Sequence, residues 1–128
     1  MKRPVWVRRE TVLALHEQSL VEFGGTAGIR DEGLLDSALA KPENLFAYGK
    51  PTIFDLAASY GFGLVKNHPF IDGNKRAGFI VAAIFLELNG YRFQATEAEA
   101  AVRTLALAAG EMSETEFGAW LKKNSLRR

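Results

Sequence analysis

Apolar residues recur with the helical period along most of the chain, which predicts helices rather than strands. Between residues 53 and 67, for example, Ile53, Leu56 and Tyr60 fall on one helical face. Segments of similar character cover residues 9–23, 31–41, 74–88, 96–110 and 113–124. We therefore expect an all-α fold of about six helices.

Capping residues mark where these segments begin and end. Three of the predicted starts carry a hydroxyl residue followed three positions later by an acidic residue, which is the capping-box pattern. Asp31 can cap a fourth start with its carboxylate. The three boxes are Thr52–Asp55, Thr96–Glu99 and Ser113–Glu116.

The segment from Asn74 to Leu88 is apolar on nearly every face, as expected of a helix at the centre of a bundle. The other helices each have one apolar face and should pack around it. Val5–Val7 and Tyr91–Phe93 add at most a short strand or two. No linker or repeat divides the chain, so we expect residues 1–128 to form a single domain.

Residues 40–51 separate two predicted helices and contain two prolines and a glycine, which predicts a loop. Phe46 and Tyr48 are unusual side chains for a plain connection. Either both aromatic rings fold back onto the core, or this loop has a function that uses them.

The charge distribution argues against nucleic acid as a direct ligand. The net charge is +1, yet eight of the sixteen basic residues lie in residues 2–9 and 122–128. The chain between these ends carries eight basic and fifteen acidic residues, a net charge of −7. Such a body lacks the basic surface that nucleic-acid binding requires.

Other bulk features favour a cytoplasmic protein without a membrane partner. The chain has no cysteine, so disulfides and thiolate chemistry are excluded. Its longest apolar run falls short of the ~20 residues that a membrane span needs. The first residues, MKRPVWVRRE, lack the apolar segment of a signal peptide.

The candidate chemistry is concentrated in NHPFIDGNKRAGF, residues 67–79. This stretch is predicted to form a loop that leads into the amino end of the central helix. Free backbone N–H groups and the helix dipole favour a phosphate at such a position. Lys75 and Arg76, in the first helical turn, oppose the dipole unless a bound polyphosphate neutralises them.

The remaining residues of the stretch complete a possible phosphate-transfer site. Gly73 lets a ligand approach the backbone, and Asn74 can donate to a phosphate oxygen. Asp72 is suited to Mg²⁺, which prefers carboxylate and phosphate oxygens. His68 has a pKa suited to removing a proton from a hydroxyl group.

Each of these residues also has an ordinary structural explanation. Asp72 can cap the helix, the two cations can be solvated, and His68 can be a hydrogen-bonded loop histidine. Their concentration within nine residues at the start of a buried helix favours a site. The other histidine, His16, has no second histidine four residues later, and we assign it a structural role on a helix face.

The sequence HPFIDGNKR, residues 68–76, closely resembles the Fic motif, H-P-F-x-[D/E]-G-N-[G/K]-R. Lys75 stands where nucleotidyl-transferring members have glycine, and it resembles the Doc branch, the death-on-curing toxins of toxin–antitoxin pairs. The stretches LALHEQSLVEFGG, GIRDEGLLDSALAKPENLF and FLELNGYRF are also similar to Doc proteins. The resemblance covers most of residues 5–124 and implies a compact Fic-type helical bundle.

The resemblance implies a role for each residue of the motif. His68 would be the general base that activates a target hydroxyl, and Asp72 would bind Mg²⁺. Gly73, Asn74 and the helix amides would form an anion hole for the phosphates of ATP. Arg76 would pair with one of these phosphates.

Two further features follow from the resemblance alone. The segment from Lys41 to Pro51 resembles the flap that aligns the target by strand addition, in which Phe46 and Tyr48 would take part. Lys66 stands two residues before His68, where Doc proteins can carry a basic residue, and a phosphate contact is expected for it.

The resemblance also implies which group is transferred. Glycine-type Fic proteins transfer AMP, whereas Doc binds ATP in the reverse direction and transfers its γ-phosphate to a threonine of elongation factor Tu, which stops translation. Lys75 would fill the space that the AMP-transferring arrangement requires. Gly73 departs from the Doc archetype, which has alanine there, so AMP transfer remains the alternative activity.

Regulation in the Doc branch comes from a separate antitoxin of the Phd type, whose disordered C-terminal tail folds into a groove on the toxin. The inhibitory pattern [S/T]-x-x-x-E-[G/N] of other Fic proteins is absent from this chain. We therefore expect a toxin with an antitoxin partner. The rival from another class is a catalytically silent helical module that only binds the antitoxin.

Overall fold

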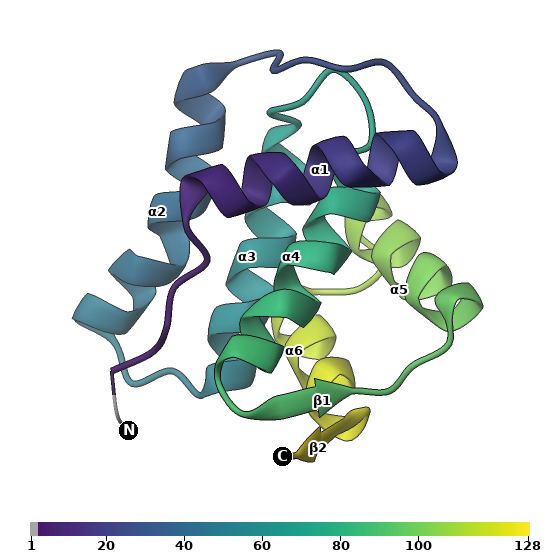
Figure 1. The fold of residues 1–128 in the computed structure, drawn as a ribbon. Helices are drawn as coiled ribbons and strands as arrows, with labels where there is room; N and C mark the ends of the chain where they lie inside the picture. The colour runs from purple at the N-terminus through teal and green to yellow at the C-terminus, as the bar shows by residue number, and fades with distance from the viewer. Residues whose placement is uncertain (1–2) are drawn as a thin grey trace.

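The computed structural model describes residues 3–128, which form six helices and one two-stranded sheet (Figure 1). Residues 1 and 2, which include one lysine of the basic amino-terminal segment, lie outside the described residues. In the described part of the chain, no helix is long and apolar enough to cross a membrane. The helices are α1 (Arg9–Phe23), α2 (Glu32–Tyr48), α3 (Ile53–Asn67), α4 (Asn74–Leu88), α5 (Glu97–Ala109) and α6 (Glu114–Lys123).

The predicted all-α bundle is confirmed, and its centre is a pair of helices. α3 and α4 lie side by side, with α2 and α6 against α3 and with α1 and α5 against α4 (Figure 1). The apolar helix α4 is central as predicted, but α3 is buried along most of its length as well. Burial of both helices fixes the short loop that joins them.

Two glycines allow α3 and α4 to approach closely. A Cβ atom on Gly78 of α4 would lie 3.0 Å from the carbonyl oxygen of Gly61 on α3 and 2.8 Å from a methyl group of Val65. The 2.8 Å contact is shorter than real Cβ atoms tolerate, so a larger residue would push the helices apart. The close contact depends on glycine at this crossing.

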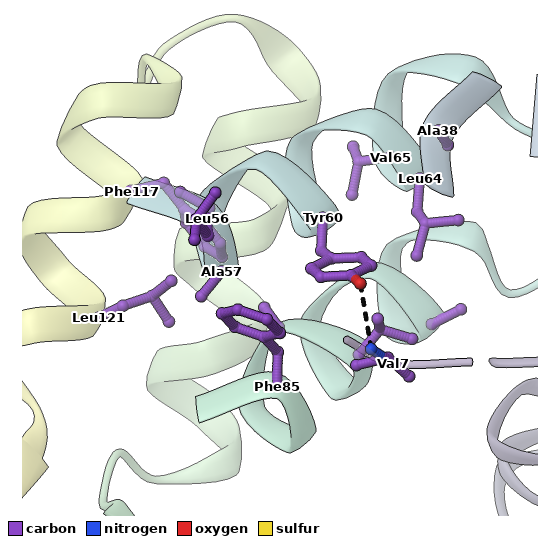
Figure 2. Close-up of a cluster of buried hydrophobic side chains, with 14 of the residues drawn as sticks. Val7, Ala38, Leu56, Ala57, Tyr60, Leu64, Val65, Phe85, Phe117 and Leu121 are labelled. Carbon is purple, nitrogen blue, oxygen red and sulfur yellow. Dashed lines mark hydrogen bonds between the residues drawn. The ribbon is translucent and has the colours of Figure 1, made fainter. Parts of the chain in front are cut away.

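The amino-terminal segment packs on this core without forming the strand predicted at Val5–Val7. The Val7 N–H donates to the Tyr60 hydroxyl at 3.1 Å within the apolar cluster (Figure 2). Burial raises the pKa of Tyr60 to about 12. The side chain of Asn89 bonds both the N–H and the C=O of Val5. Side chains, rather than a neighbouring strand, satisfy this extended backbone.

The predicted strand β1 (Tyr91–Phe93) is confirmed, and it pairs antiparallel with β2 (Ser125–Arg127). The second strand was not predicted from the sequence, because its residues are mostly polar and carry no alternating pattern. Pairing with β1 ties the end of the chain to the end of α4.

The predicted loop over residues 40–51 is wrong for most of its length, because α2 continues to Tyr48. Pro42 lies inside this helix and is buried, although proline removes one helical hydrogen bond. Phe46 packs on the core with its ring centroid 5.8 Å from that of Trp6, whereas Tyr48 is 91 % exposed. One of the two rings thus folds back onto the core and the other does not.

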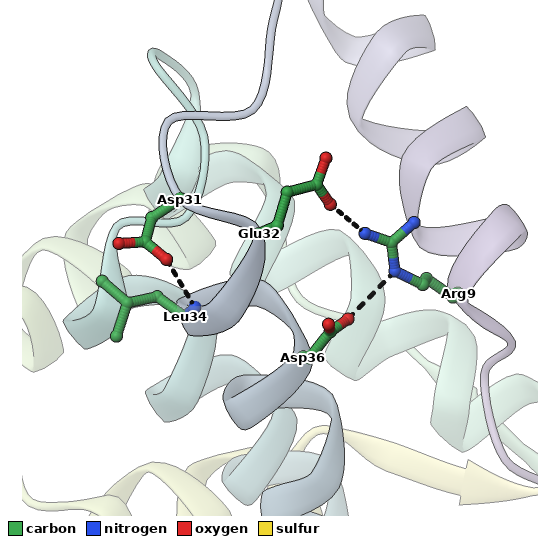
Figure 3. Close-up of polar contacts among 5 residues, drawn as sticks. All are labelled: Arg9, Asp31, Glu32, Leu34 and Asp36. Atoms are coloured by element: carbon green, nitrogen blue, oxygen red, sulfur yellow. Dashed lines mark hydrogen bonds and ion pairs between the residues drawn. The ribbon is translucent and has the colours of Figure 1, made fainter.

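The amino end of α2 is fixed by a cap and by ion pairs with α1. The Asp31 carboxylate accepts from the Leu34 N–H at 2.9 Å, which confirms the predicted cap (Figure 3). Arg9 on α1 pairs with Glu32 and Asp36 on α2 (Figure 3). Exposed ion pairs contribute little stability each, but these orient the start of α2 beside the loop that follows α3.

Candidate active site

The candidate site is the loop of residues 68–73 that joins α3 to α4. His68 ends α3 in the left-handed conformation, with φ 49° and ψ 54°. Gly73 is also left-handed, with φ 78°, and directly precedes α4. No side chain caps the amino end of α4. By contrast, α2, α3, α5 and α6 are each capped by a side chain, those of Asp31, Thr52, Thr96 and Ser113. The first N–H groups of the central helix are thus available for an anion.

The Asn74 side chain closes the loop. It is 5 % exposed. Its Oδ1 accepts from the Phe70 N–H and its Nδ2 donates to the Phe70 carbonyl, both at 2.9 Å. Nδ2 also lies 3.3 Å from Nδ1 of His68. The side chain predicted to contact phosphate therefore orders the loop instead, and the backbone N–H of Asn74 belongs to the uncapped helix start.

Asp72 holds its carboxylate at the mouth of this helix start. Oδ2 accepts from the Thr26 N–H at 3.1 Å, and Oδ1 accepts from the Gly73 N–H at 2.8 Å. These two hydrogen bonds, aided by the charge of Arg76, lower the pKa of Asp72 below its usual value. A Cβ on Gly25 would lie 2.9 Å from the same carboxylate, so glycine is needed where the α1–α2 segment passes. Asp72 is thus an ionised, oriented carboxylate.

The structural role predicted for His16 is confirmed, and its place is at the site. Its ring is buried and stacks on Phe70, with centroids 3.7 Å apart and planes 8° from parallel. Its Nε2 donates to the Asp72 carbonyl at 2.7 Å. α1 thereby fixes the loop through both the Asp72 backbone and the Phe70 ring. The sequence carried no signal for this contact, since the partners are 56 residues apart.

The segment that lies beside the loop is residues 28–31, not the flap predicted at Lys41–Pro51. The N–H groups of Arg30 and Asp31 donate to the Pro69 carbonyl, and the Ile71 N–H donates to the Gly28 carbonyl. α2 ends at Tyr48, and four residues link it to Ile53 at the amino end of α3, whereas His68 follows the carboxyl end of that helix, which has fifteen residues and is about 22 Å long. The structure therefore does not bring Phe46 or Tyr48 to His68.

A pocket of about 260 Å³ opens at this helix start. Arg76 is held in place by the ring of Phe23, which lies 4.6 Å from its guanidinium carbon. Lys66 lies outside the pocket lining and donates to the Ala108 carbonyl at 3.1 Å, at the end of α5. The lining residues are His68, Ile71, Asp72, Gly73, Asn74, Lys75 and Arg76. Six of the seven predicted motif and phosphate residues therefore meet in one pocket, and Lys66 does not.

A larger groove adjoins the pocket through Lys75 and Arg76, which line both. We call it the α1–α4–α5 groove. Its volume is about 630 Å³, and its walls are mainly apolar. The lining residues are Glu22, Phe23, Lys75, Arg76, Phe79, Ile80, Glu97, Ala100, Ala101, Thr104 and Leu105.

The donor set of the pocket fits a magnesium–nucleotide complex. Each oxygen of Asp72 accepts one N–H and retains a further lone pair. Mg²⁺ is commonly held by one or two carboxylates with phosphate oxygens and water. Within residues 3–128, no cluster of three or more histidine or acidic side chains could hold a metal by itself.

The fold and the pocket define a helical protein with an uncapped helix start, an oriented carboxylate and an adjacent histidine. The profile of the Fic/DOC family matches residues 6–86, and the chain belongs to this family. It is 39% identical over 93 residues to "Toxin Doc" of Mycolicibacterium smegmatis, covering 70% of this chain and 68% of the relative. It is 30% identical over 115 residues to "Protein kinase doc" of Escherichia phage P1, covering 89% and 90%.

The hydrogen bonds to Asp72 predict a pH-dependent contribution to stability. Because its pKa in the folded protein is below its ordinary value of 3.8, this contribution is fully present above that value. It is lost as the pH falls through the lower, folded-state pKa. Asp72→Asn should therefore reduce the free energy of unfolding near neutral pH, and the gap to the parent protein should close in acid.

Urea unfolding of both proteins at several pH values between about 6 and 2 measures this gap. A gap that stays constant over the whole range would contradict the assignment of the ionised carboxylate as the hydrogen-bond acceptor.

Proposed function

We propose that the protein is a Doc-type toxin that transfers the γ-phosphate of ATP to a threonine hydroxyl of a protein target, with elongation factor Tu as the target. One observation carries the proposal. The uncapped start of α4, the ionised carboxylate of Asp72 and the ring of His68 line a single pocket. The names of the two relatives, a toxin and a protein kinase, support the same activity.

The phosphates would lie on the amino end of α4. Its free N–H groups and dipole attract anions. Lys75 and Arg76 add two positive charges that are unfavourable there without a ligand. Bound phosphates remove this conflict, and during transfer these groups stabilise the charge on the moving phosphoryl group.

His68 would act as the general base. Its side chain is exposed, so its neutral tautomers exchange through solvent. The tautomer with a free Nε2 lone pair can accept a proton, and it gives up the long contact between Nδ1 and the Asn74 amide. The hydroxyl proton passes to His68 as the hydroxyl oxygen bonds to the γ-phosphorus. The bond from that phosphorus to the β–γ bridging oxygen breaks, and ADP leaves. His68 then releases its proton to solvent.

Asp72 would hold Mg²⁺, which supplies charge neutralisation of the phosphates when it is bound. The Thr26 and Gly73 amides keep the carboxylate ionised and aimed at the pocket mouth. His16 and Asn74 fix the backbone on both sides of it. The protein thus contributes position and charge, which is what phosphoryl transfer requires.

The proposal includes an antitoxin whose tail folds into the α1–α4–α5 groove. Two side chains of this groove, Phe23 and Leu105, are 49% and 58% exposed although they are apolar. Lys75 and Arg76 at one end of the groove favour an acidic residue on the tail. A tail bound in this way would also cover two residues of the phosphate pocket, so it would oppose ATP binding.

Isotope labelling separates γ-phosphate transfer from the alternative, AMP transfer. With purified elongation factor Tu, label should pass from γ-labelled ATP and not from α-labelled ATP. His68→Ala should lower the rate by about 10²–10⁴-fold, while its circular dichroism spectrum stays that of the parent protein.

Transfer of the α-label would replace the kinase activity with AMP transfer. Equal rates for the parent protein and a folded His68→Ala variant would remove His68 from the mechanism.

Calorimetry with the product of the neighbouring gene tests the groove. Leu105→Arg places a charge in the groove and should weaken binding at least about tenfold, or about 1.4 kcal/mol. Val102→Arg is the matched control, because Val102 is an exposed apolar residue of the same helix that lies outside the groove lining. Equal affinities for both variants would place the antitoxin elsewhere.

A further inference from the structure

Arg30 hydrogen-bonds to the carboxyl end of α3, although it lies 37 residues before Asn67 in the sequence. Its Nε donates to the His68 carbonyl at 2.7 Å, and its Nη2 donates to the Asn67 carbonyl at 2.9 Å. Its backbone N–H donates to the Pro69 carbonyl at 2.7 Å. Arg30 therefore binds the carbonyl groups of three successive residues, Asn67, His68 and Pro69.

His68, whose carbonyl Arg30 binds, has a backbone conformation that other contacts must stabilise. Among residues 3–128, His68 is the one residue other than glycine with a positive φ. Residues other than glycine rarely adopt this left-handed backbone conformation, and they remain in it only when their surroundings enforce it. The carbonyls at the end of a helix lack helical partners, and a cation is favourable beside them. The guanidinium fork supplies both partners and charge.

The remaining supports of His68 are weaker or indirect. The amide of Asn74 lies 3.3 Å from its ring, at the long end for a hydrogen bond. The Asn67 side chain donates to the Leu34 carbonyl and ties α3 to α2 without touching the His68 peptide. Direct side-chain hydrogen bonds to the His68 carbonyl come, within the described chain, from Arg30.

We infer that Arg30 is a positioning residue for His68: it holds the peptide in the left-handed conformation that directs the imidazole toward the phosphate pocket. This inference rests on the proposed role of His68 as the base. Arg30 does not line that pocket, and so it acts through His68 rather than on the nucleotide. A different role, direct binding of ATP by an exposed cation, makes the opposite kinetic prediction.

Steady-state kinetics of three variants separate these roles. Arg30→Ala should lower kcat by about 10²-fold, the effect of a misplaced catalytic group, and should leave KM for ATP near the parent value. Arg30→Lys should recover little of this loss, because an ammonium group cannot bridge two carbonyls as the planar fork does. Added guanidinium ion at low millimolar concentration should restore part of the activity of Arg30→Ala. Arg103→Ala, at an exposed arginine of α5 outside the site, is the matched control and should behave as the parent.

A rise in KM for ATP with unchanged kcat would overturn the inference in favour of nucleotide binding. An Arg30→Ala protein with parental kinetics would overturn it outright.

Amide hydrogen exchange of the protein without nucleotide gives a readout that does not depend on activity. In Arg30→Ala, the amides of Phe70 and Ile71 should exchange faster, because the loop is released, while the amides in the middle of α4 should not change. If the parent protein transfers no phosphate, the proposed function fails, and this measurement still decides whether Arg30 orders the His68 loop. Unchanged exchange at Phe70 and Ile71 would overturn the positioning role.

Discussion

The close contact between α3 and α4 is the constraint on which the site depends. A Cβ on Gly78 would lie 2.8 Å from a methyl group of Val65 and 3.0 Å from the Gly61 carbonyl oxygen, so the two helices lie nearly backbone to backbone at this crossing. The chain must then turn from the end of one helix to the start of the other within six residues, 68–73. That turn places His68, at the end of α3, in one pocket with the first residues of α4. His68 and the uncapped helix start are neighbours for this reason.

Polar groups in and around the loop keep its shape, and the groups that we propose to bind the ligand remain open. The Asn74 side chain hydrogen-bonds to the backbone of Phe70, and the His16 ring nitrogen hydrogen-bonds to the Asp72 carbonyl. What stays available is the uncapped helix start with two cations in its first turn, and a carboxylate whose pKa is lowered. Two cations and the positive end of the helix dipole face a single carboxylate, and this excess of positive charge is the physical argument for the proposed phosphate ligand.

Local signals in the sequence were sufficient for most helices and for the motif. Caps such as Thr52 and Ser113 act within one turn, so α3 and α6 begin where the sequence predicts. The predicted end of α2 failed because Pro42 and the following polar residues resemble a loop, whereas packing of Phe46 on Trp6 sustains the helix. The contacts of Arg30, Thr26 and His16 with the loop were also missed. They join residues 37 to 56 positions apart, and no local pattern encodes them.

The central claim is that the first turn of α4 binds the phosphates of ATP beside His68. The most direct test is a titration of the isotopically labelled protein with magnesium and ATP, followed by amide nuclear magnetic resonance. The largest shifts should fall on the backbone amides of Asn74, Lys75 and Arg76, with His68 and Asp72 next. Shifts concentrated where α2 ends and α3 begins, around Tyr48 and Ile53, with no change at the start of α4, would contradict the account.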